Sequence, residues 1–84
     1  MNYELTVHAS ESLRKRANIR RDWLERVMAQ PQLVHPDLVD SELEHRMGRI
    51  DEFEGRVLRV IVNPKVDPVR VITVFFDRSM RGKR

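Results

Sequence analysis

The chain has 84 residues, no cysteine, and a net charge of +3 from 16 basic and 13 acidic residues. A domain of this size buries only roughly 60–65 % of the surface that its unfolded chain exposes, so we expect one sheet and one or two helices in a single domain over residues 1–84. The absence of cysteine excludes disulfides and thiolate metal sites and fits a reducing cytoplasm. No signal peptide opens the sequence, and no segment approaches the ~20 apolar residues that span a bilayer, so we expect a cytoplasmic protein without membrane contact.

The first expected element is a strand over residues 3–8, because apolar and polar residues alternate strictly there. In that strand His8 points away from the core. Ser10 is the expected N-cap of a short helix that follows. The buried face of this helix repeats every four residues, at Ala9, Leu13 and Ala17.

A second helix is expected from about Arg20 to Gln30, where one apolar stripe faces a charged side and Pro31 stops the helix. The stripe consists of Ile19, Trp23, Leu24, Val27 and Met28.

Further strands are expected over residues 32–39, 43–50, 56–63 and 69–77. Pro36 removes a ladder donor from the first of them, which therefore belongs at an edge or a bulge. The element order is β-α-α-β-β-β-β, and short loops between consecutive strands favour an antiparallel meander. We therefore predict an α+β fold in which two N-terminal helices pack on one face of a four- to five-stranded antiparallel sheet, while the other face stays open.

Strand alternation predicts which residues occupy that open face. The residues assigned to the helix side are Leu5, Val7, Leu58, Val60, Val62, Ile72, Val74 and Phe76. Polar residues of the opposite parity, namely Thr6, His8, Arg59 and Thr73, then face away from the helices.

No metal-ligand, phosphate-loop or serine-nucleophile motif is present, so no cofactor and no metal site is expected. His8, His35 and His45 lie in three separate segments and are treated as proton carriers or surface residues.

Cleavage of RNA by its own ribose 2′-hydroxyl needs a base, an acid and cations but no metal, and histidine with arginine supplies all three. The candidate set is His8, Arg46, Arg49, Arg59 and Thr73. The structural alternative is that His8 caps the first helix, that the arginines cover strand edges with their stems, and that Thr73 is an ordinary strand residue.

Charge is unevenly distributed along the chain, since residues 37–54 are mainly acidic and residues 56–84 mainly basic. A basic end can attract a polyanion such as RNA. Phe75 shares the parity of Thr73 and is the aromatic candidate for base stacking, whereas Trp23 and Phe76 are assigned to the core. The tail over residues 78–84 either clamps a phosphate backbone or frays in solvent. Its bases are Arg78, Arg81, Lys83 and Arg84.

Several short motifs resemble a bacterial family known as domain of unknown function 4258. They are the entry Thr6-Val-His-Ala9, a basic helix that carries Arg16, the helix from Ile19 to Gln30-Pro31, and the strand motifs of residues 55–62 and 71–74. Many members carry glycine before that isoleucine, where this chain has Ala17-Asn18. The resemblance implies a fold similar to the RelE, ParE and BrnT toxins, in which the sheet face opposite the helices meets RNA. It also implies that His8 is the family histidine, Thr73 the final-strand threonine and Arg16 the helix arginine.

The sequence is compatible with three functions. The first is a toxin-like, metal-independent endoribonuclease of a toxin-antitoxin pair, acting on RNA or the ribosome. The second is a non-catalytic module that uses the same fold to bind nucleic acid or protein. The third is a gyrase-type poison that binds a protein through the first helix and the tail. In a toxin, an acidic antitoxin-like partner or a homodimer would cover the basic face.

Overall fold

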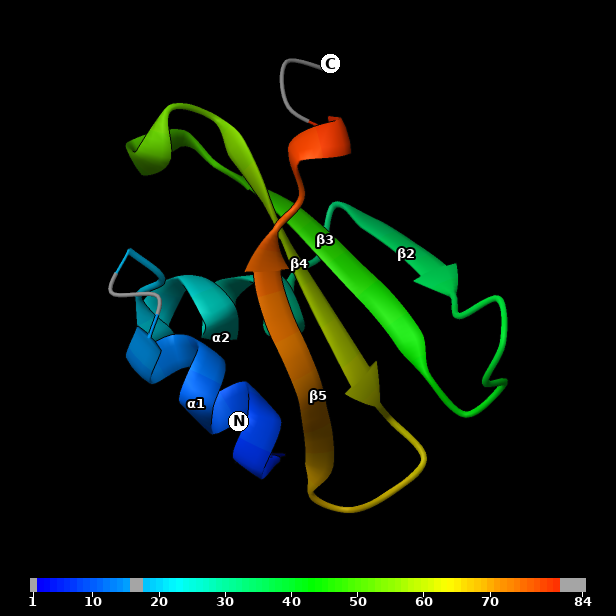
Figure 1. The fold of residues 1–84 in the computed structure, drawn as a ribbon. Helices are drawn as coiled ribbons and strands as arrows, with labels where there is room; N and C mark the ends of the chain where they lie inside the picture. The colour runs from blue at the N-terminus through cyan, green and yellow to red at the C-terminus, as the bar shows by residue number, and fades with distance from the viewer. Residues whose placement is uncertain (1, 16–17, 81–84) are drawn as a thin grey trace.

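Two helices cover one face of a five-stranded sheet in the computed structural model, which describes residues 2–15 and 18–80 (Figure 1). The elements are β1 (Tyr3–Leu5), α1 (Val7–Lys15), α2 (Arg21–Ala29), β2 (Leu33–Pro36), β3 (Glu44–Ile50), the 3-10 turn η1 (Asp51–Phe53), β4 (Arg56–Asn63), β5 (Val69–Phe76) and the 3-10 turn η2 (Arg78–Met80). The predicted α+β fold and the order β-α-α-β-β-β-β are confirmed. In the part of the chain that the structure describes, no helix has the length and apolarity that crossing a membrane requires.

The sheet is mixed, which corrects the expectation of a purely antiparallel one. Strands β2 to β5 form the predicted antiparallel meander, and β1 lies parallel to β5 in the order β1-β5-β4-β3-β2. After β1 the chain passes through both helices to the far edge of the sheet and returns strand by strand, so β5 arrives beside β1 in the same direction. The first and last strands of the chain are therefore hydrogen-bonded neighbours.

The entry into α1 differs from the prediction. The strand ends at Leu5, and His8 lies in the first turn of α1 instead of at the end of a strand. The expected N-cap at Ser10 is wrong, because the Thr6 hydroxyl already accepts the N–H of Ala9 at 3.1 Å. A threonine side chain that accepts this bond satisfies one of the unpaired donors of a helix start. Val7, assigned to the core, is 77 % exposed.

Thr6 also bonds the last strand. Its N–H donates to the Val71 carbonyl at 3.0 Å and its hydroxyl donates to the Ile72 carbonyl at 3.0 Å. The pairing of β4 with β5 shifts by one residue here, because Ile61 faces Thr73 while Val62 faces Val71. Because of this bulge, Val71 points into the core, whereas strand alternation assigns Ile72 to that side.

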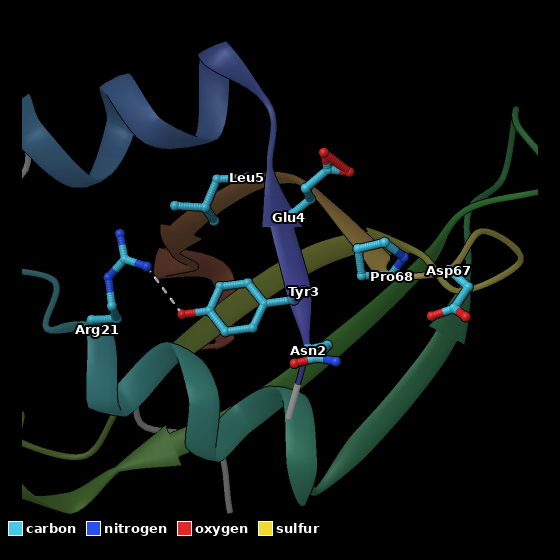
Figure 2. Close-up of a pocket in the computed structure, with 7 residues that line it drawn as sticks. All are labelled: Asn2, Tyr3, Glu4, Leu5, Arg21, Asp67 and Pro68. Atoms are coloured by element: carbon cyan, nitrogen blue, oxygen red, sulfur yellow. Dashed lines mark hydrogen bonds between the residues drawn. The ribbon is translucent and has the colours of Figure 1, made fainter.

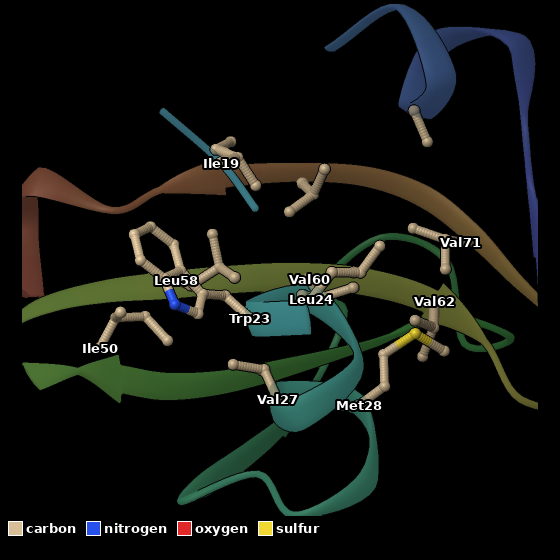
Figure 3. Close-up of a cluster of buried hydrophobic side chains, with 12 residues drawn as sticks. Ile19, Trp23, Leu24, Val27, Met28, Ile50, Leu58, Val60, Val62 and Val71 are labelled. Atoms are coloured by element: carbon tan, nitrogen blue, oxygen red, sulfur yellow. The ribbon is translucent and has the colours of Figure 1, made fainter. Parts of the chain in front are cut away.

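The core lies between the helix pair and the sheet, as Figure 3 shows. The predicted stripe on α2 is confirmed, since Ile19, Trp23, Leu24, Val27 and Met28 are all buried. The sheet contributes Ile50, Leu58, Val60, Val62, Val71 and Val74. At one end of the core Trp23 stacks on Phe53 with ring centroids 5.7 Å apart and meets the edge of Phe76 at 6.3 Å, so the assignment of Trp23 and Phe76 to the core is correct.

Gly48 sets the distance between α2 and β3. A Cβ atom at this position would lie 2.9 Å from the Cγ2 atom of Val27. The Val27 side chain therefore packs on the backbone of β3 at Gly48, and a larger side chain at this position would force Val27 or its helix to move.

We predict that Thr6→Val lowers the free energy of unfolding by about 1–3 kcal/mol, because it strips the acceptor from the Ala9 N–H and the donor from the Ile72 carbonyl. Urea unfolding followed by circular dichroism measures the change. Thr73→Val is the matched control: the Thr73 hydroxyl makes no hydrogen bond among the described residues, and the change should stay within about 0.5 kcal/mol. Equal losses in the two variants would show that the Thr6 bonds contribute nothing.

We predict that Gly48→Ala costs about 1–3 kcal/mol, since the new methyl group overpacks the contact with Val27. Combining it with Val27→Ala should cost less than the sum of the two single changes, because the shortened side chain leaves room for the methyl group. Strict additivity in this double-mutant cycle would refute the contact as the cause.

Candidate functional site

Arg59 is at the centre of a chain of charged and polar groups on the sheet face that the helices leave open. Its Nη1 atom lies 2.7 Å from Nδ1 of His45, and its Nη2 atom lies 2.6 Å from a carboxylate oxygen of Asp77. His45 in turn places Nε2 at 2.6 Å from Oδ1 of Asp37. Four neighbouring strands contribute to this group, with Asp37 directly after β2, His45 on β3, Arg59 on β4, and Asp77 directly after β5.

The two partners of His45 define its tautomer. A guanidinium group can only donate, so Nδ1 accepts the bond from Arg59 and Nε2 carries the proton that goes to Asp37. A carboxylate that holds one ring nitrogen while the other accepts protons is the arrangement that orients a histidine for acid-base chemistry.

A second histidine faces the first. His35 on β2 is directly opposite His45 on β3, so the two side chains project from the same face of the sheet. Both line a hollow of about 440 Å³ together with Arg59 and the apolar residues Pro36, Leu38 and Val39. This volume is in the range of small-ligand pockets.

The carboxylates of this group are held in their charged form. The N–H of Asp40, followed by the His45 ring and the N–H of Val39, lowers the pKa of Asp37 from 3.8 to about 2. Burial raises the pKa of Asp77, but the bonds from Ser79 and the charge of Arg59 outweigh it, so the pKa of Asp77 lies below its usual value.

Arg46 and Arg49, two of the predicted site residues, lie on opposite faces of the sheet because they are three positions apart on β3. Arg46 is on the helix side, where it donates to the Met28 carbonyl at 3.0 Å and to Glu44 at 2.6 Å. It thus caps the last turn of α2, which favours a cation. Arg49 shares the face of Arg59 and pairs with Asp51 at 3.2 Å.

The remaining predicted residues that the structure describes fall in three places. His8 is exposed on α1, which belongs to the helix layer and covers the opposite face from Arg59. Thr73 and Phe75 are on the open face, with Phe75 directly opposite Arg59. Arg78 is exposed in η2. Arg16, Arg81, Lys83 and Arg84 lie outside the described residues.

The open face is less polar than predicted. Met47 and Val57 occupy it beside Arg59 and are buried, and Ile61 is half-buried. The ionic group is therefore set among apolar side chains, which strengthens its electrostatic interactions.

A larger hollow of about 710 Å³ lies at the opposite edge of the sheet, beside β1 (Figure 2). Its polar groups already bond one another: the Tyr3 hydroxyl donates to Glu25 at 2.7 Å and accepts from Arg21 at 3.2 Å. Burial, followed by the bond to Glu25, raises the pKa of Tyr3. No histidine lines this hollow, so the group around Arg59 is the better candidate for chemistry. Within residues 2–15 and 18–80, no three His, Asp or Glu side chains are placed to hold a metal ion.

The family described as Domain of unknown function (DUF4258) matches residues 5–76. The chain therefore belongs to this family, and the resemblance seen in its motifs is confirmed at that level. No curated protein and no solved structure matches the chain.

We predict that the free energy of unfolding falls as the pH drops below about 4, most steeply between pH 3.8 and about 2. Folding lowers the pKa of Asp37, so as the pH falls its carboxylate binds a proton more readily in the unfolded chain. The stabilisation that this carboxylate gives is therefore complete above pH 3.8 and is lost as the pH falls towards about 2. Asp37→Asn should flatten this part of the curve, whereas Asp67→Asn, on the exposed loop before β5, should leave it unchanged. Urea unfolding in steps from pH 6 to pH 2 measures the free energy of unfolding of both variants. If Asp37→Asn and the unchanged protein showed the same dependence on pH, the prediction would be contradicted.

Proposed function

We propose that the chain is a metal-independent ribonuclease that acts at His45, His35 and Arg59. The observation that carries the proposal is the position of His45, which is held by Asp37 at 2.6 Å on one side and lies 2.7 Å from the Arg59 guanidinium on the other. An oriented histidine, a second histidine and a cation in one hollow are the groups that internal cleavage of RNA requires.

The reaction can be written with these residues alone. Nδ1 of His45 takes the proton of a ribose 2′-hydroxyl, and the 2′-oxygen then bonds to the adjacent phosphorus. The bond from phosphorus to the 5′-oxygen breaks, and that oxygen takes a proton from His35. The products are a 2′,3′-cyclic phosphate and a 5′-hydroxyl, and a water molecule later restores the two protonation states. Arg59 stabilises the extra negative charge on the phosphorus oxygens.

RNA must displace Asp77 for this to happen. Arg59 pairs with the Asp77 carboxylate, and the Asp37 carboxylate lies on the far side of His45, so the free site is not cationic overall. A phosphate that takes the place of Asp77 gives Arg59 a bidentate partner and frees Nδ1 of His45 to act as a base. RNA would approach over β4 and β5, whose basic residues are Arg56, Arg59 and Arg70.

The helix pair on one face and the ionic group on the other support a likeness to the RelE, ParE and BrnT toxins. On this proposal the substrate is cytoplasmic RNA, free or on the ribosome, and an acidic antitoxin-like protein covers the open face.

A second candidate function is a binding module without catalysis. It is favoured by the fact that both nitrogens of His45 and two nitrogens of Arg59 already have partners within the chain. In that case the group links the ends of β2 and β5 to β3 and β4 and performs no chemistry.

The test is incubation of the purified protein with total RNA and with translating ribosomes in the presence of EDTA, with the ends of the fragments identified. We predict cleavage that leaves cyclic phosphates, and a fall of about 10²–10⁴-fold in its rate for His45→Gln and for Arg59→Lys.

His8→Gln is the control, because His8 is an exposed histidine in the other layer and its removal should leave the rate unchanged. Loss of cleavage in this variant with retention in His45→Gln would move the site to the residue that the family resemblance implies. Binding of RNA without cleavage would instead establish the binding module. Thermal unfolding of each variant separates lost chemistry from lost fold.

A further inference from the structure

The outer edge of β2 is apolar and uncovered. This strand pairs only with β3 and ends the sheet, as Figure 1 shows. Among the described residues the exposed large apolar side chains are Val7 and four residues of one short segment. These four are Leu33 (40 % exposed), Val34 (46 %), Leu38 (100 %) and Val39 (95 %).

An open strand edge is a template for another strand, and most proteins protect it with lysine or with a covering element. Here the only protective device is Pro36, and no Lys or Arg occurs anywhere in residues 27–45. A group of exposed apolar residues at such an edge marks an interaction surface.

The backbone of β2 leaves one donor free for a partner. Asp37 donates its N–H to the Leu43 carbonyl of the β3 side. Because N–H directions alternate along a strand, the N–H of His35 points to β3 and that of Val34 points outwards. Pro36 shares the outward parity and has no N–H to leave unpaired.

Hydrogen bonds within the loop after β2 fix its shape and leave Leu38 and Val39 exposed. The Asp37 carboxylate accepts the N–H groups of Val39 at 3.1 Å and Asp40 at 2.9 Å. Asp40 then accepts the N–H of Glu42 at 3.0 Å, and its carbonyl accepts the N–H of Leu43 at 3.1 Å. Leu38 and Val39 are therefore presented by an ordered turn, which reduces the entropy that a partner must overcome.

Charge selects the kind of partner. The carboxylates of Asp40 and Glu42 are exposed beside the apolar residues, and neither forms an ion pair with a described residue. They disfavour a nucleic acid, and they disfavour a second copy paired through β2, because that arrangement would bring two such loops together.

We infer that the outer edge of β2 and the loop over residues 37–43 bind an extended segment of another protein that alternates apolar residues with Lys or Arg. The segment adds a sixth strand, bonds the Val34 backbone, packs its apolar residues on Leu33, Leu38 and Val39, and places its cations near Asp40 and Glu42. Leu38 and Val39 also line the hollow beside His45, so this surface adjoins the site proposed for chemistry. The inference rests on the exposed edge and its carboxylates and does not require that chemistry.

The test is a titration of ¹⁵N-labelled protein with a seven-residue peptide that alternates lysine with valine, compared with a peptide that alternates glutamate with valine. The expected result is a set of amide shifts confined to β2 and the loop, slower hydrogen exchange at Val34, and binding at least tenfold weaker for the glutamate peptide and in high salt. The double variant Leu38→Asp, Val39→Asp should weaken binding at least tenfold, and the double variant Asp40→Lys, Glu42→Lys should reverse the preference between the peptides.

Val7→Asp is the matched control, since Val7 is an exposed apolar residue on α1 at the other side of the sheet, and it should change nothing. Equal binding of both peptides, or no binding of either, overturns the inference. The protein could instead form a dimer in solution that the Leu38→Asp, Val39→Asp variant dissociates, which would assign the edge to a second copy. The same amide shifts with a short oligoribonucleotide would assign the edge to RNA. Either result also overturns the inference.

Discussion

The Thr6 hydroxyl is the interaction on which the architecture depends most. One oxygen atom accepts the N–H that starts α1 and donates to the carbonyl exposed by the bulge in β5. A single side chain thus satisfies a polar group at each of the two places, the Ala9 N–H at the start of α1 and the Ile72 carbonyl at the bulge in β5. The junction thus ties the start of α1 to β5, directly after the parallel ladder that β1 forms with the same strand.

Much of the fold could be predicted from local pattern. The stripe on α2, the ends of β3, β4 and β5, and the edge position of the strand with Pro36 follow from periodicity and from the special geometry of proline. The start of α1 could not, because the alternation of residues 3–8 is equally compatible with a strand and with a short strand followed by a cap. Only the tertiary bond from Thr6 to β5 decides between them.

For the candidate site, the sequence indicated the types of residue, arginine with histidine, but not which histidine lies beside Arg59. The sequence identified Arg59 and the use of histidine, and it assigned the role to His8 because strand alternation placed that residue on the open face. His45 replaces it as the neighbour of Arg59, since the register between β3 and β4 sets them on one face and no feature within a single strand encodes that register. The separation of Arg46 from Arg49, by contrast, follows from their odd spacing on one strand. Asp37 and Asp77 gave no signal of their own, because each lies just beyond a strand and is brought to the site only by the folded sheet.

The pairing of β1 with β5 has a consequence for how the protein is made. Strand β1 leaves the ribosome before both helices and the other four strands, and its partner β5 is the last of these elements to be synthesised. The meander from β2 to β5 can assemble while translation continues, but the N-terminal strand and helix can dock only when β5 has emerged. The Thr6 junction therefore closes only after β5 has emerged, and until then the apolar surface of the sheet is open to chaperones and to neighbouring nascent chains.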